Sequence, residues 1–298
     1  MARRCPRDNI LDGAIRSVDV AHSRRRKLAI ETLSMSQTVQ PVRLKPSTVE
    51  AFEGYVREAE AAMEQTLSES GPFLWSDGSP ERARQVREGK VLAERWSGKE
   101  AVRVPEGLIH DWIGVVFVPG ATIAGTLTLL QDYDNHKSIY KPEVIDSKVL
   151  SHQDDDFQIF LRLLKKKIIT VVLDTDHDVH YRCLEPTRWL CRSYTTRIVE
   201  VEDAGRPKEK SLPPDAGYGF LWRLDSYWRL QESDGGVYVE CRAISLTRDV
   251  PKALRWLIDP IVRKLPKESL IHTLTATRQA LSLPIAPVPV PAPLTPSL

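Results

Sequence analysis

Two strand patterns, joined by a tight turn and followed by an amphipathic segment, constrain the fold of this chain most. Residues 218–230 (YGFLWRLDSYWRL) and 237–248 (VYVECRAISLTR) flank Asp234-Gly235-Gly236, and this arrangement is typical of a β-hairpin. The segment that follows has apolar residues at helical spacing: Leu254, Leu257, Ile258, Ile261 and Leu265, then Leu270, Leu274 and Leu281 beyond Pro266. A hairpin that leads directly into a long helix predicts an antiparallel sheet with this helix on one face.

The order of the remaining patterns predicts an α+β fold. Strand patterns occur at residues 107–118, 157–164, 168–183 and 189–201, and a helical pattern occupies residues 121–132. Helices do not alternate with strands, which excludes a doubly wound parallel sheet. We therefore expect a curved antiparallel sheet wrapped around the long C-terminal helix, which is the helix-grip arrangement.

Composition divides the chain into four parts. Residues 1–45 are expected to be a basic disordered leader with a charge of +6, which leaves −4 on the rest of a chain whose net charge is +2. Residues 46–105 form an N-terminal helical extension, since Val49, Phe52, Val56, Ala59 and Met63 recur at spacings of three and four. Residues 106–282 form the main domain, and residues 283–298 form a Pro-rich disordered tail.

Composition also limits the class of protein. The sequence has no apolar run long enough to span a membrane and no apolar core of a secretory signal, so we expect a soluble, cytoplasmic protein. Its positive charge lies in the leader rather than on the expected folded body, which argues against a nucleic-acid partner. Cys5, Cys183, Cys191 and Cys241 show no metal spacing, and we expect reduced thiols, no metal and no cofactor.

Several local motifs together resemble a known superfamily. They are residues 131–136 (QDYDNH), 140–144 (YKPEV), 147–149 (SKV), 192–198 (RSYTTRI) and 234–251, with Glu268-Ser269-Leu270 and Thr273-Leu274 near the C-terminus. On these residues the chain from about 107 to 282 is similar to the START-like, or SRPBCC, superfamily, near its polyketide cyclase and coenzyme Q binding branch. The resemblance implies a helix-grip fold with an internal cavity for a lipid, an isoprenoid or a polyketide.

Strand alternation nominates the residues that line such a cavity. The apolar faces of the strand patterns supply most of them, and three polar residues are candidates for orienting the ligand. The expected ligand-binding residues are Phe157, Ile159, Leu161, Leu173, Tyr181, Tyr194, Phe220, Trp222, Leu224 and Trp228, with Arg162 and Arg197.

Three functions stay open from the sequence. The first is binding, or transport, of a hydrophobic small molecule by a monomer, with a transient membrane contact left open. The second is a cyclase or hydratase that acts on such a ligand, with His136, Asp134 or His180 as the candidate acid or base. The third is a non-catalytic interaction protein in which the apolar faces form a filled core.

A calcium loop is also suggested by Asp174, Asp176 and Asp178 with Glu185. Val179 stands where the sharp turn of an EF-hand loop needs glycine, so we expect a strand end at this place instead.

Overall fold

The computed structural model describes residues 40–68, 71–96, 98, 101–166, 170–249 and 264–282. Within these residues a ten-stranded antiparallel sheet forms the centre of the molecule, with strands in the order β2-β4-β12-β11-β8-β7-β6-β5. β3 and β9 extend the sheet beside β4 and β8. The strands are β2 (Leu92–Arg95), β3 (Val102–Val104), β4 (Gly107–Pro119), β5 (Val144–Gln153), β6 (Asp156–Lys166), β7 (Thr170–Glu185), β8 (Arg188–Glu202), β9 (Lys210–Ser211), β11 (Arg223–Ser233) and β12 (Gly236–Arg248).

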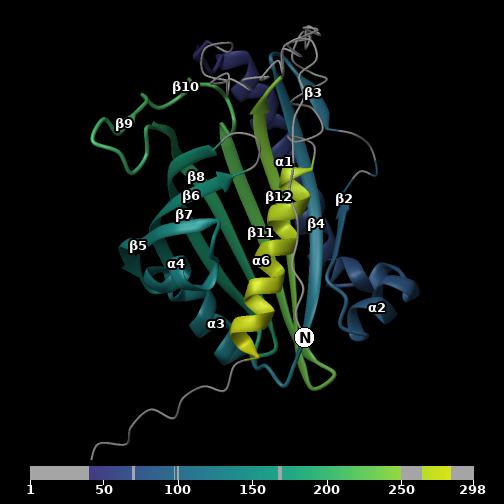
Figure 1. Cartoon of the computed structure of the whole chain (residues 1–298). Helices are drawn as coiled ribbons and strands as arrows, with labels where there is room; N and C mark the ends of the chain where they lie inside the picture. Colours follow the sequence, from purple (N-terminus) through teal and green to yellow (C-terminus); the bar gives the residue numbers. More distant parts are fainter. Residues whose placement is uncertain are drawn as a thin grey trace, which may run out of the picture.

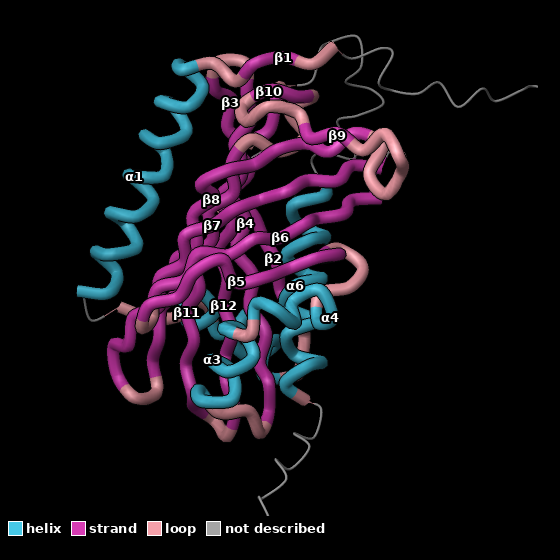
Figure 2. Tube along the Cα trace, turned by 90° about the vertical axis from the view of Figure 1, so that its left-hand side faces the viewer, coloured by secondary structure: helices cyan, strands magenta, loops and turns pink. Residues whose placement is uncertain are grey.

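One long helix lies on each face of this sheet (Figures 1 and 2). α6 (Leu265–Leu281) packs on the inner face against β4 and β12, and α1 (Pro46–Ser68) lies on the outer face. The α+β helix-grip fold expected from the sequence is confirmed. Pro266 lies in the first turn of α6, where proline is well tolerated; the expected helical stripe from Leu254 to Ile261 lies outside the described residues.

Short helices close one end of the inner face (Figure 1). They are α3 (Ile123–Gln131), η3 (Tyr133–Asn135) and α4 (His136–Ile139), and they connect β4 to the edge strand β5. Thr122 caps α3 by accepting a hydrogen bond from the Gly125 amide at 3.2 Å. The residues before β4 add η2 (Trp75–Gly78) and α2 (Pro80–Arg87), and the two-residue strands β1 (Val42–Arg43) and β10 (Ala216–Gly217) pair with each other.

The strand expected over residues 218–230 starts later than the pattern indicated, at Arg223. The chain before it turns around the buried carboxylate of Glu200, which accepts hydrogen bonds from the amides of Tyr218 and Gly219, each at 2.8 Å. Gly219 has a φ of +79°, and a Cβ at this position would lie 2.4 Å from Arg248. Residues 218–222 therefore do not continue β11, and Trp222 does not lie on the face that strand alternation predicted.

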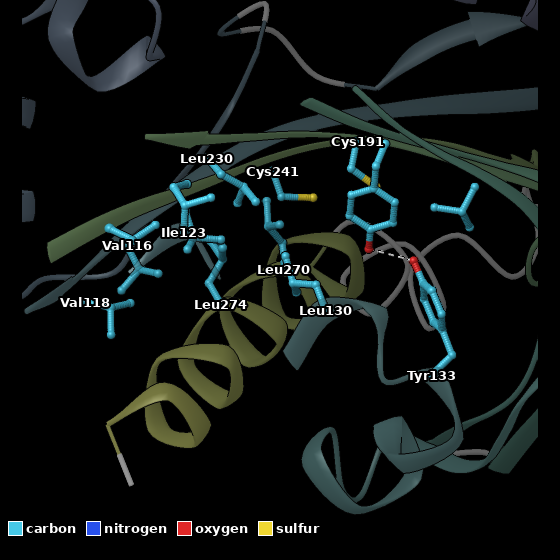
Figure 3. Close-up of a cluster of buried hydrophobic side chains, with 14 of the residues drawn as sticks. Val116, Val118, Ile123, Leu130, Tyr133, Cys191, Leu230, Cys241, Leu270 and Leu274 are labelled. Atoms are coloured by element: carbon cyan, nitrogen blue, oxygen red, sulfur yellow. Dashed lines mark hydrogen bonds between the residues drawn. The ribbon is translucent and has the colours of Figure 1, made fainter. Parts of the chain in front are cut away.

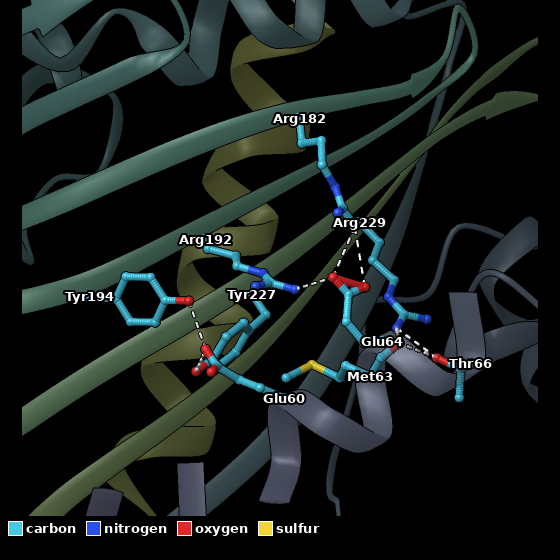
Figure 4. Close-up of polar contacts among 9 residues, drawn as sticks. All are labelled: Glu60, Met63, Glu64, Thr66, Arg182, Arg192, Tyr194, Tyr227 and Arg229. Atoms are coloured by element: carbon cyan, nitrogen blue, oxygen red, sulfur yellow. Dashed lines mark hydrogen bonds and ion pairs between the residues drawn. The ribbon is translucent and has the colours of Figure 1, made fainter. Parts of the chain in front are cut away.

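Ion pairs and hydrogen bonds from tyrosine hydroxyls attach α1 to the outer face of the sheet (Figure 4). Glu60 accepts hydrogen bonds from the hydroxyls of Tyr194 at 2.7 Å and Tyr227 at 3.0 Å. Glu64 pairs with Arg192 at 2.9 Å and with Arg182 at 3.2 Å. None of the helices that the structure describes has the length and apolar character needed to cross a bilayer.

Candidate functional site: an apolar cavity under the C-terminal helix

A cavity of about 340 Å³ lies between the inner face of the sheet and the first turns of α6. Side chains from β6, β7, β8, β11 and β12 form one wall, α6 forms the opposite wall, and η3 and α4 supply a side. Alternation along each strand creates this wall, because every second side chain points inward. The residues that line it on the sheet include Ile159, Leu161, Leu163, Val171, Leu173, Val179, Leu224, Trp228 and Ala243.

The floor of the cavity is a packed apolar core (Figure 3). Leu270 faces the cavity, and Leu274, one turn further along α6, is fully buried in this core. Leu130 from α3 and Cys241 from β12 complete the boundary. The same sheet and helix therefore form a solid core along one half of α6 and a hollow along the other.

The central strands show this hollow in the exposure of their side chains. Ala243 and Trp228 lie on interior strands of the sheet, yet both are only partly buried. Their outward-facing neighbours Arg242 and Tyr227 are buried. Ala243 and Trp228 therefore keep part of their surface exposed to the hollow, although helix α6 covers this face of the sheet.

Seven of the expected ligand-binding residues lie in the cavity wall: Ile159, Leu161, Leu173, Tyr181, Phe220, Leu224 and Trp228. Phe157 belongs to the packed core below the cavity, where its ring stacks on His152 at 4.1 Å between centroids.

The other four lie elsewhere. Tyr194 and Trp222 face α1 on the outer side, in a cluster with Phe52 and Val56. Arg162 makes a bidentate ion pair with Asp174, at 2.6 and 2.9 Å, and Arg197 pairs with Asp176 at 3.1 Å. These four side chains are therefore not placed to contact a ligand in the cavity.

The structure separates the three candidate acid-base residues. His136 lines the cavity, whereas Asp134 is exposed and accepts a hydrogen bond from the Val149 amide at 3.0 Å. His180 is exposed and contacts Asp156 at 2.7 Å on the outer face. The geometry does not assemble these three residues into one catalytic group.

Polar side chains that strand alternation did not nominate also lie in the wall. His177 is buried there, and Glu143 and Lys165 form an ion pair at the end next to α6. The odd-numbered face of β7 that contains Leu173 and Tyr181 also contains His177, so the sequence signal for it was present.

The acidic residues that resembled a calcium loop lie along strand β7. Asp174 forms an ion pair with Arg162, and Asp176 forms one with Arg197. Within the described ranges, no group of three or more His, Cys, Asp or Glu side chains is arranged to hold a metal ion.

The fold belongs to the helix-grip class, in which a curved antiparallel sheet wraps around a C-terminal helix, and here an apolar cavity lies between the two. No protein-family model and no curated protein sequence matches the chain. Similar solved structures include a STAR-related lipid transfer protein from Xanthomonas axonopodis, with 17% identity, a TM-score of 0.42 and coverage of 61% of this chain and 97% of that chain.

Two further solved structures resemble this chain. A START superfamily protein from Mycobacterium smegmatis has 15% identity and a TM-score of 0.39, and covers 58% of this chain and 97% of its own. The Zhui aromatase/cyclase from Streptomyces sp. R1128 has 13% identity and a TM-score of 0.40, with coverage of 58% and 93%. The likeness to these structures is one of fold alone.

Proposed function

We propose that this protein binds a hydrophobic small molecule in the cavity under α6. The observation that carries the proposal is the cavity itself, whose volume of about 340 Å³ lies within the range of small-molecule sites. A filled core would leave no such space, because protein interiors are normally packed to the density of organic crystals.

The cavity wall supplies the driving force for binding. Transfer of apolar ligand surface from water to a wall of leucine, isoleucine, valine and tryptophan side chains is favourable by roughly 25 cal/mol per Å². Part of this free energy is offset by the cost of association and of ordering the ligand. A molecule that fills most of the cavity is therefore the expected ligand.

Native mass spectrometry after incubation with a mixed lipid extract tests the proposal. We expect the wild-type protein to retain ligand at a one-to-one ratio. Ala243→Phe should lose this retention, because Ala243 faces the cavity from the middle of the sheet and the larger ring occupies the ligand's space.

Ala62→Phe is the matched control. It adds the same ring at an exposed position of α1 and should leave retention unchanged. Retention of ligand by Ala243→Phe at the wild-type level, or a wild-type protein that stays free of ligand, would count against the proposal.

A further inference from the structure

The charges in the cavity wall are compensated within the protein. Among the described residues that line the cavity, Glu143 and Lys165 carry the opposite charges, and they form an ion pair with each other. The Lys165 ammonium also donates to the Ser269 hydroxyl of α6 at 2.6 Å. A charged ligand group would therefore find no uncompensated partner among these wall residues.

The two histidines buried in the wall are neutral at physiological pH. Burial lowers the pKa of His136 and of His177 to about 4. Both nitrogens of His177 have partners, since Nε2 lies 2.9 Å from the Thr175 hydroxyl and Nδ1 lies 3.4 Å from the Ser193 hydroxyl. Neither ring offers a positive charge to an anion in the cavity.

His136 differs from His177 in its hydrogen bonding. Its Nε2 lies 3.1 Å from the Leu130 carbonyl oxygen, and a carbonyl only accepts hydrogen bonds. The proton of the neutral ring is therefore on Nε2, and Nδ1 is an acceptor.

A pair of tyrosines lies beside this ring. The hydroxyls of Tyr133 and Tyr181 are 2.8 Å apart, and the Tyr133 ring centroid lies 4.6 Å from that of His136. One hydroxyl of the pair donates to the other, so the pair can both donate and accept further hydrogen bonds. All three residues line the cavity, and together they form a hydrogen-bonding corner in a mostly apolar wall.

Resting on the proposed function, we propose that the ligand is a neutral amphipathic alcohol whose hydroxyl group lies at the corner formed by Tyr133, Tyr181 and His136. The hydroxyl donates to Nδ1 of His136 and accepts from the tyrosine pair, and the apolar body extends along the wall beneath α6. An ionised carboxylate in the same position lacks a cation and loses its hydration, which disfavours it strongly.

Three probes with the same twelve-carbon chain test this inference: dodecan-1-ol, dodecyl methyl ether and dodecanoate. Their affinities are measured at pH 8, where the carboxylate is ionised, by displacement of Nile red. We expect dodecan-1-ol to bind at least ~10-fold more tightly than dodecanoate. It should also bind at least ~3-fold more tightly than the ether, because the ether cannot donate a hydrogen bond.

Variants then locate the hydroxyl. The double variant Tyr133→Phe/Tyr181→Phe, and separately His136→Phe, should each reduce the preference for dodecan-1-ol over the ether by ~3-fold or more. Tyr194→Phe is the control, because Tyr194 lies on the outer face of the sheet and its hydroxyl donates to Glu60 of α1 at 2.7 Å. This control should keep the wild-type preference.

The outcomes separate the two proposals. Dodecanoate that binds as tightly as dodecan-1-ol, or a preference for the alcohol that survives in both variants, would overturn the neutral-alcohol inference and leave cavity binding in place. Failure of all three probes to bind would overturn both.

Discussion

Trp228 of β11 and Cys241 of β12 are direct partners in the antiparallel register, and Cys191 of β8 is the partner of Trp228 on its other side. The three side chains therefore form a row across the inner face of the sheet, and all three line the cavity. This row places two thiols next to the space proposed for the ligand.

The thiols should report on the cavity in a labelling experiment. Burial raises the pKa of Cys191 to about 12 and that of Cys241 well above its usual range, whereas Cys183 is exposed. Because the thiolate is the reactive form, a Cys5→Ser/Cys183→Ser protein should react with iodoacetamide at pH 8 much more slowly than wild type. A bound ligand should slow the reaction with iodoacetamide further. Peptide mass spectrometry measures the modification of each cysteine, and rapid modification of Cys191 or Cys241 would contradict the prediction.

The buried ion pair between Asp111 and Arg242 should be costly to break on one side. Arg242 donates two hydrogen bonds to Asp111, at 2.9 and 2.6 Å, and Tyr55 donates a third to the same carboxylate at 2.8 Å. Arg242→Met leaves a buried carboxylate without its cation and should reduce the free energy of unfolding by about 3–5 kcal/mol.

A compensated variant is the control for this prediction. Tyr55→Phe/Asp111→Leu/Arg242→Met removes the whole polar group and should recover most of the lost stability in urea denaturation. An Arg242→Met protein as stable as wild type would show that the pair is not buried as described.

Glu240 should give the stability of the protein a measurable pH dependence. Burial raises the pKa of Glu240 to about 7, above the 4.5 or so of an unfolded glutamate. Between these two pH values the folded state binds the additional proton, so the contribution of Glu240 to stability decreases as pH rises.

Glu240→Gln should remove this contribution and gain stability over wild type as pH rises from 5 to 8, by on the order of 3 kcal/mol at the upper end. The amide oxygen can still accept from Trp75, whose backbone N–H lies 2.7 Å from the carboxylate. Thermal unfolding across this pH range measures the difference, and a constant difference between variant and wild type would argue against the assignment.

Gly114 should be essential for the docking of α6. A Cβ at this position would lie 2.8 Å from both the Leu274 side chain and the Leu92 carbonyl oxygen. Gly114→Ala should therefore destabilise the fold by about 1–3 kcal/mol, measured by urea denaturation. Gly71→Ala, where the added Cβ meets nothing within 4 Å, is the control and should have a stability close to that of wild type.

Long strands with mostly buried side chains could be predicted from the sequence. β4 and β12 have strongly apolar sequences because both faces are covered, by α6 on one side and by the N-terminal elements on the other. The edge strand β5 was not predicted. Most of its side chains are exposed, so its sequence lacks the apolar alternation that identifies a strand.

The wall of the candidate site could be predicted in part from strand alternation. Leu224 and Trp228, which alternation assigned to the apolar face, line the cavity from β11. Trp222 does not, because the loop around Glu200 breaks the alternation before β11 begins. Tyr194 was assigned to the cavity, but its hydroxyl binds Glu60 of α1, and a sequence pattern within one strand cannot show what covers its outer face.

The position of α1 determines which fragments of this chain can be studied in isolation. A fragment that starts at residue 106 would match the expected main domain, yet it would leave Ile109, Trp222, Ile244 and Leu246 uncovered on the outer face. Exposed apolar patches of this kind favour aggregation. Expression of the cavity-bearing sheet on its own therefore requires a start at or before Pro46, so that the helix packed behind the sheet is retained.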